Sequence, residues 1–212
     1  MSGESVAYHL RQNKHVDRQL FVELLSLVNR SYPVRKALYV SFGGVYFEDF
    51  KLIHNVFGTE KLLSIEQEPW VIKRQKHNKP FGCIRCEELK SRTLVTNIND
   101  YRTEFRDPQL ICWLDFASTN RRAQLEDVSV LLKNSRAGDV VRITMNANPG
   151  TLGEQREGEL VADRDARRLA TLRRKLADKL PGEVDDKDIT AKAFPALMLS
   201  MLKLEMAKQY QQ

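Results

Sequence analysis

The sequence predicts a doubly wound α/β fold with a mainly parallel sheet. Through the first two thirds of the chain, short apolar runs alternate with segments of helical periodicity, which is the pattern of strands joined by crossover helices. The clearest unit is residues 37–66, where a strand, a glycine turn, a helix and a second strand follow one another. Right-handed crossovers between the five expected strands give the order 3-2-1-4-5, with helices on both faces.

The composition indicates one globular α/β domain. The chain has 212 residues, of which 42% are hydrophobic, and this is enough to bury one sizeable core. No apolar segment approaches the roughly 20 residues that a bilayer crossing needs, and the first residues lack a signal pattern, so we expect a cytoplasmic protein that does not contact a membrane. The net charge of +6 is compatible with an acidic partner such as nucleic acid but does not require one.

Three regions are expected along the chain: a helical lead at 1–34, the α/β core at 35–150 and a helical extension at 151–212. The lead contains a helix over residues 9–30, and the apolar face of this helix is expected to pack on the sheet. That face consists of Val16, Leu20, Leu24, Leu27 and Val28. The polar stretch 10–15 either borders the ligand crevice or is a solvated lead-in.

The core begins with a strand over residues 37–42, a continuous apolar run of the kind that is covered on both faces. Gly43 and Gly44 end it. Glycines let the backbone approach a ligand where a Cβ would obstruct it, and the amides at the start of the next helix can bind an anionic group. That helix, over residues 45–57, has apolar residues at helical spacing, and Gly58 stands where a helix stop is expected.

The second strand, residues 61–66, ends on the carboxylate of Glu66. This position, about twenty residues after the glycines, is where a doubly wound fold places the acid that accepts hydrogen bonds from ribose hydroxyls. Gly43, Gly44 and Glu66 therefore predict a nucleoside site. The full G-x-G-x-x-G is absent, which disfavours a dinucleotide loop and with it a nicotinamide-dependent dehydrogenase.

A helix from Pro69 to about Asn78 leads into a third strand at residues 83–87, which ends on Glu87 and Glu88. These acids either contact a ligand at the strand end or are surface carboxylates of a loop.

The cysteines predict buried thiols. They are Cys83, Cys86 and Cys112. Their odd number does not suggest a disulfide framework, and the C-x-x-C pair has no second pair or histidine set beside it to complete a metal site.

The fourth strand lies in residues 109–116 and ends at Asp115. Because burying a charge without partners is costly, a single acid after an apolar run indicates a functional carboxylate at the rim of the crevice. A helix at 125–134 and a fifth strand at 140–145 follow. The polar turn at 146–150 either meets substrate or bonds its own backbone.

The helical extension carries two amphipathic patterns. The first has leucines at helical spacing beside the basic residues of 164–175, and it is either a packing seam with a solvated side or a surface for RNA or phosphate. The second begins near Thr190 and has Phe194 and Met198 on its apolar face. That face needs a sheet, another helix, a partner protein or a second protomer to cover it.

Residues 35–150 resemble a class I S-adenosylmethionine-dependent methyltransferase, through their topology and through Gly43, Gly44, Glu66 and Asp115. The resemblance implies a Rossmann-like core in which the glycine turn seats the methionine part of S-adenosylmethionine and Glu66 binds its ribose. It also implies that Asp115 holds the amino group or the proton of the nucleophile, as the catalytic residue, and that the third strand end, at Glu87, contacts adenine.

Two further segments, residues 8–18 and 42–50, are similar to a group of bacterial putative O-methyltransferases, which implies methyl transfer to an oxygen of an acceptor. Class I enzymes usually add two strands after the fifth, and we find none after Met145, so the sheet edge and the helix of Phe194 are expected to be exposed. The exit at 114–117 lacks the Asn-Pro-Pro-Tyr motif of base-amino methyltransferases. The alternative is a non-catalytic module on the same fold that binds a nucleoside, RNA or a protein.

Overall fold

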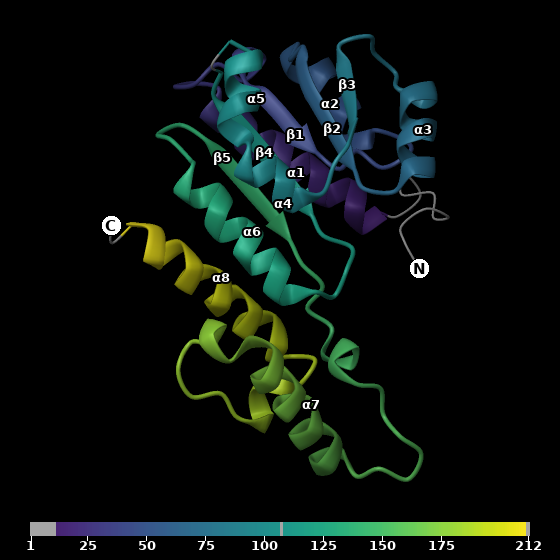
Figure 1. The fold of residues 1–212 in the computed structure, drawn as a ribbon, viewed down its shortest axis with the longest axis vertical. Coiled ribbons are helices and arrows are strands. Elements are labelled where there is room, and N and C mark those ends of the chain that lie inside the picture. The colour runs from purple at the N-terminus through teal and green to yellow at the C-terminus, as the bar shows by residue number, and fades with distance from the viewer. Residues whose placement is uncertain (1–11, 107, 211–212) are drawn as a thin grey trace. The chain divides into compact units, whose positions relative to one another are not determined.

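The computed structural model describes residues 12–106 and 108–210 (Figure 1). Their contacts divide the chain into two compact units. The sheet unit comprises residues up to Asp115 together with Asn134–Thr144, and the helical unit comprises Phe116–Lys133 and the residues from Met145 onward. The division of the sequence at residues 34 and 150 remains a prediction, because compact units defined by contacts need not coincide with continuous regions of sequence.

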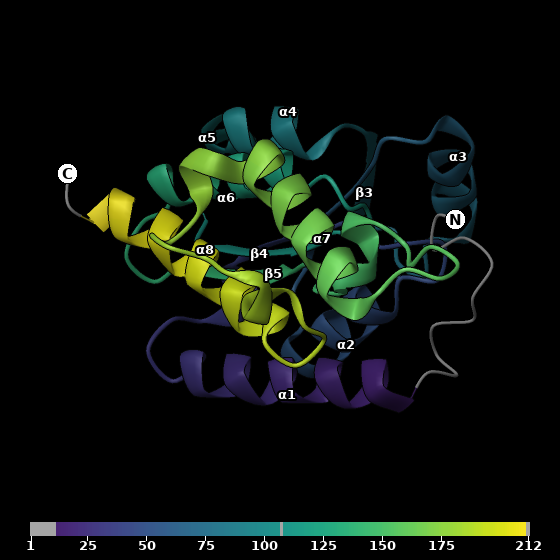
Figure 2. The same cartoon turned by 90° about the horizontal axis from the view of Figure 1, so that it is seen from below.

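The sheet unit is built on five parallel strands in the order β3-β2-β1-β4-β5, which confirms the predicted fold class. The strands are β1 (Leu38–Ser41), β2 (Lys61–Glu66), β3 (Ile84–Glu88), β4 (Leu110–Asp115) and β5 (Val140–Thr144). The helices are α1 (Gln12–Val28), α2 (Glu48–Phe57), α3 (Pro69–Asn78), α4 (Ser91–Thr96) and α5 (Ile98–Glu104). Figure 2 shows α1 and α2 on one side of the strands and α4 and α5 on the other. All four residues of β1 are buried, as expected of a covered parallel strand.

The outer face of α1 differs from the prediction. Phe21, Val22 and Leu25 are buried, whereas four of the five side chains predicted to pack inward are about half exposed. These are Val16 at 55%, Leu20 at 59%, Leu24 at 49% and Leu27 at 57%. The helix has two apolar faces, and the face with the aromatic ring packs because Phe21 meets Trp113 edge to face at 5.4 Å.

The helical unit contains α6 (Arg121–Lys133), α7 (Val161–Leu176) and α8 (Phe194–Tyr210). Its core joins Leu125 of α6 with Leu172 of α7 and Phe194 of α8. The leucine pattern is therefore a packing seam. The expectation that the helix of Phe194 would be exposed is wrong, because Phe194 is fully buried by the other helices of its own unit.

Several arginines of α7 bind within the helical unit. Arg167 pairs with Glu159 at 2.8 Å, and this pairing lowers the pKa of the glutamate to about 2. Arg168 donates to the carbonyl of Gly153 at 2.8 Å, and Arg173 donates to that of Val184 at 2.7 Å. These guanidinium groups fasten neighbouring loops to α7. A nucleic-acid surface on residues 164–175 stays a prediction.

Two further predictions concern thiols and membranes. Cys112 is buried, as predicted, and burial raises its pKa to about 12. Cys83 and Cys86 are half-buried, which corrects the expectation that all three thiols are buried.

Among the described residues no group of three His, Cys, Asp or Glu side chains is placed to hold a metal ion. None of the described helices combines the length and apolar character that a bilayer crossing requires.

Candidate functional site

Three of the predicted site residues leave the sheet along one edge. Ser41 of β1 lies opposite Ser64 of β2 and Trp113 of β4. Two residues beyond this row, the three chains reach Gly43, Glu66 and Asp115 respectively. Because neighbouring strands are about 4.8 Å apart, the glycine turn lies between the two acids at the carboxyl edge of the sheet. We call these three positions, with Gly44, the rim.

Glycine is required at the two positions of the rim for different physical reasons. Both have left-handed backbone angles, with φ of +70° at Gly43 and +56° at Gly44. A Cβ on Gly43 would lie 2.4 Å from Oγ of Ser64, so this position is filled by the protein itself. A Cβ on Gly44 would have no heavy atom of the described residues within 4 Å. Gly44 is therefore the glycine that leaves room for a ligand to approach the backbone.

A buried glutamine fixes the glycine turn. Nε2 of Gln75, from α3, donates to the carbonyl oxygens of Phe42 at 2.8 Å and of Gly44 at 3.0 Å. The hydroxyl of Ser64 donates to Oε1 of the same glutamine at 3.0 Å. Both side chains are fully buried. Sequence reasoning missed Gln75, although its position four residues after the apolar Val71 could have shown that it faces inward.

Replacing Gln75 with leucine should lower the free energy of unfolding by about 1 to 3 kcal/mol, because it leaves two turn carbonyls without this donor. Urea denaturation measures the change. The matched control is Gln67→Leu, which changes an exposed glutamine next to the rim and should stay within about 0.5 kcal/mol of the parent protein. Equal effects from the two substitutions would show that the turn is not held by Gln75.

Helix α2 begins directly after the turn with an unusual residue. Phe47, its N-cap, is fully buried and has a φ of +54°, a conformation that is strained in residues other than glycine. Phenylalanine has no polar group to cap the first amides of the helix. Asp49 accepts a hydrogen bond of 2.7 Å from the hydroxyl of Tyr39 on β1, and burial raises the pKa of both groups. This bond joins the start of α2 to the sheet.

The carboxylate of Glu66 is oriented by the chain that follows it. Its Oε1 accepts hydrogen bonds from the amides of Gln67 at 2.7 Å and Glu68 at 3.1 Å. Two backbone donors on one oxygen fix the plane of the group. A charged acceptor is thus held at the end of β2, next to the glycine turn.

The structure does not bring Glu87 to the rim. Strand β3 ends at Glu88, one residue later than predicted, and it is Glu88 that lies opposite Glu66. A one-residue shift turns the neighbouring side chain to the other face of a sheet. Glu87 instead pairs with Arg85 and accepts a hydrogen bond of 2.5 Å from Tyr101 of α5. A contact with adenine stays a prediction that these partners do not favour.

Asp115 has a partner that the sequence did not identify. Nζ of Lys14, in the first turn of α1, is 3.3 Å from each of the two carboxylate oxygens. Of the two interpretations of the polar stretch 10–15, this contact favours the one that borders the crevice. Leu10 and Arg11 of that stretch lie outside the described residues.

The turn after β5 bonds its own backbone. The side-chain oxygen of Asn146 accepts from the amide of Asn148 at 2.9 Å, and that of Asn148 accepts from the amide of Gly150 at 2.8 Å. Arg121 donates to the carbonyls of Asn146 at 2.9 Å and Asn148 at 3.3 Å. These bonds favour a structural role for the turn over contact with substrate.

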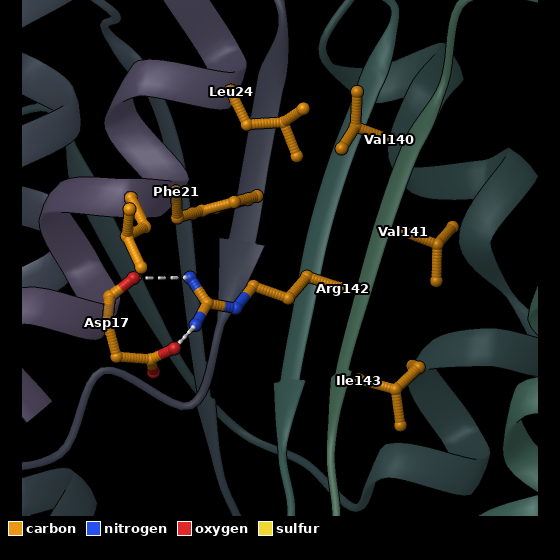
Figure 3. A pocket seen from close by; sticks show the side chains of 8 residues that line it. Asp17, Phe21, Leu24, Val140, Val141, Arg142 and Ile143 are labelled. Atoms are coloured by element: carbon orange, nitrogen blue, oxygen red, sulfur yellow. Dashed lines mark hydrogen bonds and ion pairs between the residues drawn. The ribbon is translucent and has the colours of Figure 1, made fainter. Parts of the chain in front are cut away.

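A groove lies between α1 and β5 (Figure 3). It is lined by apolar side chains of both elements, and Arg142 crosses it to pair with Asp17. The guanidinium carbon of Arg142 is 3.8 Å from the ring centroid of Trp113 and 4.6 Å from that of Phe21. The arginine thereby fastens α1 to the edge of the sheet.

Comparison with known proteins identifies a family. The model of a protein family described as putative O-methyltransferase matches residues 6–212, which is nearly the whole chain. Searches of the curated proteins and of the solved structures gave no match. The chain has the five-stranded parallel sheet that the resemblance to methyltransferases implies, and the matched family covers both of its units. The protein therefore belongs to the putative O-methyltransferase family.

Proposed function

We propose that the protein transfers a methyl group from S-adenosylmethionine to an oxygen atom of its acceptor. The observation that supports this most directly is that Gly43, Glu66 and Asp115 each stand two residues after the same row of paired residues in three adjacent strands. In open α/β sheets, ligands bind outside the carboxyl ends of the strands where the strand order reverses. In this sheet the reversal lies between β1 and β4, which is where Gly43 and Asp115 emerge.

The residues of the rim fit a nucleoside with an amino-acid tail. Gly44 leaves open the space that a Cβ would fill. The amides at the start of α2 suit the carboxylate of the tail. Glu66 would accept hydrogen bonds from the ribose hydroxyls, and Asp115 would bind the ammonium group of the tail.

Bound S-adenosylmethionine supplies an electrophilic methyl group on a positively charged sulfur. The side chains of the rim would contribute mainly by holding cofactor and acceptor in line and by excluding water. When the acceptor is a hydroxyl, the alternative role of Asp115 is to take its proton. Gln75 and Tyr39 would not touch either ligand, since they hold the glycine turn and the start of α2.

Calorimetric titration of the purified protein with S-adenosylmethionine, and separately with NAD, tests the proposal. We expect binding heat with S-adenosylmethionine and none with NAD. Heat with NAD alone would indicate a dehydrogenase on the same sheet. Heat with neither ligand would favour a non-catalytic module that does not bind this cofactor, and it would overturn the proposal.

Replacing Glu66 with alanine should weaken the binding of S-adenosylmethionine by about 1 to 3 kcal/mol, which is the usual value of hydrogen bonds to a charged acceptor. The affinity for 5′-methylthioadenosine should fall by a similar factor, because that ligand keeps the ribose. The matched control is Glu68→Ala, which removes an equal charge two residues away and should change affinity little. Unchanged binding in Glu66→Ala would exclude this residue from the ribose site.

A further inference from the structure

The pair formed by Lys14 and Asp115 connects two segments that are 101 residues apart in the sequence. Lys14 comes from α1, which precedes the first strand, and Asp115 is the last residue of β4. The ammonium nitrogen is equidistant from the two carboxylate oxygens, at 3.3 Å. Both side chains reach solvent, with exposed fractions of 27% for the lysine and 35% for the aspartate.

The lysine presents to Asp115 the same chemical group that an amino-acid ligand would present. The α-ammonium group of the tail of S-adenosylmethionine is a primary ammonium, as is the end of a lysine side chain. A carboxylate can accept hydrogen bonds from more than one donor, but two ammonium groups on one carboxylate repel each other. The ligand and Lys14 therefore have reason to compete for Asp115.

We propose that Lys14 belongs to the ammonium subsite of the rim, where it occupies Asp115 in the free protein and gives way to the ammonium group of the ligand. This inference rests on the proposed function. Lys14 thereby sets the affinity for ligands that carry an amino-acid tail, and it does not affect the nucleoside part.

Replacing Lys14 by the ammonium group of the ligand at Asp115 costs little free energy. A partly exposed pair of this kind stabilises the free protein little, and it is weakened further by salt. Helix α1 does not need to move when Lys14 leaves, because Asp17 of the same helix remains bound to Arg142, through a backbone hydrogen bond of 3.2 Å and an ion pair. Phe21 also stays packed on Trp113.

Calorimetry of Lys14→Met with three ligands tests the proposal. The ligands are S-adenosylmethionine, S-adenosylhomocysteine, which has the tail but a neutral sulfur, and 5′-methylthioadenosine, which has no tail. We expect the first two to bind about twofold to fivefold tighter than to the parent protein, the factor that a partly exposed ion pair represents. The affinity for 5′-methylthioadenosine should not change.

Two further variants complete the experiment. Lys36→Met removes the same charge just before β1, at the other end of that strand from the rim, and should leave all three affinities unchanged. Asp115→Asn should weaken the binding of the two ligands that have a tail. Adding Lys14→Met to Asp115→Asn should then have no further effect, because the competition requires the carboxylate.

Other outcomes overturn the inference. Weaker binding of both tailed ligands to Lys14→Met would show that the lysine holds the carboxylate of the tail. Tighter binding of S-adenosylmethionine alone would show repulsion of the sulfonium and no competition for Asp115. An unchanged affinity would show that Lys14 is outside the subsite. In these three cases the parent protein binds S-adenosylmethionine and the proposed function stands, whereas a parent protein that binds neither tailed ligand refutes both.

Discussion

Replacing Arg102 with methionine should lower the free energy of unfolding by about 3 to 5 kcal/mol, the usual cost of removing one partner of a buried ion pair. The guanidinium group of Arg102 and the carboxylate of Asp139 are 1% and 2% exposed. The same carboxylate accepts hydrogen bonds from the amides of Leu110 at 2.8 Å and Arg136 at 2.7 Å. The pair thus joins α5 to the starts of β4 and β5. Urea denaturation of the variant measures the change.

A matched control separates burial from the loss of an arginine. Arg85 also pairs with carboxylates, those of Glu87 and Glu104, but its side chain is 44% exposed. Arg85→Met should therefore cost no more than about 1 kcal/mol. Adding Asp139→Asn to Arg102→Met should recover part of the loss, because it removes the stranded charge. Equal costs for the two arginine substitutions would contradict the burial argument.

The ion pair of Arg102 and Asp139 also explains why helix α5 could not be predicted from the sequence. The strands were predictable because short runs rich in apolar residues recur between helical segments, and four of the five end on an acid or just before a glycine. Helix α5 was not, since its buried face consists of Ile98 and Arg102, and a buried arginine does not contribute to apolar periodicity. Its burial depends on Asp139, which is 37 residues away. The choice between the two apolar faces of α1 depended in the same way on a distant ring, that of Trp113.

The rim could be predicted in part for a related reason. Parallel strands end at one edge, so the order of the strands and the position of each terminal acid place Glu66 and Asp115 beside the glycine turn. The residues that fix or neutralise these groups could not be predicted. Gln75 reaches Phe42 across 33 residues and Lys14 reaches Asp115 across 101, and no spacing rule connects such pairs. Glu87 shows the opposite problem, since an error of one residue in the end of β3 changes which acid lies next to Glu66.

Replacing Gly43 with alanine should destabilise the protein by about 2 to 5 kcal/mol. A left-handed backbone angle costs alanine about 1 to 2 kcal/mol, and overpacking a filled site costs about 1 to 3 kcal/mol more. The site is filled because Oγ of Ser64 would be 2.4 Å and a ring carbon of Phe50 3.1 Å from the new Cβ. Thermal or urea unfolding gives the stability change. A loss below about 1 kcal/mol would show that the turn adopts another conformation at little cost.

The neighbouring substitution Gly44→Ala is the control for Gly43→Ala. It should affect ligand binding more than stability. The backbone strain is similar, since φ is +56°, but the new Cβ meets no heavy atom of the described residues within 4 Å. We expect a stability loss of only about 1 to 2 kcal/mol. Binding of S-adenosylmethionine should weaken about tenfold or more, because the methyl group takes the space through which a ligand reaches the turn, and tenfold corresponds to about 1.4 kcal/mol. A Gly44→Ala variant that binds normally would mean that the open side of the turn does not face the cofactor, and the assignment of the rim would then rest on the two carboxylates alone.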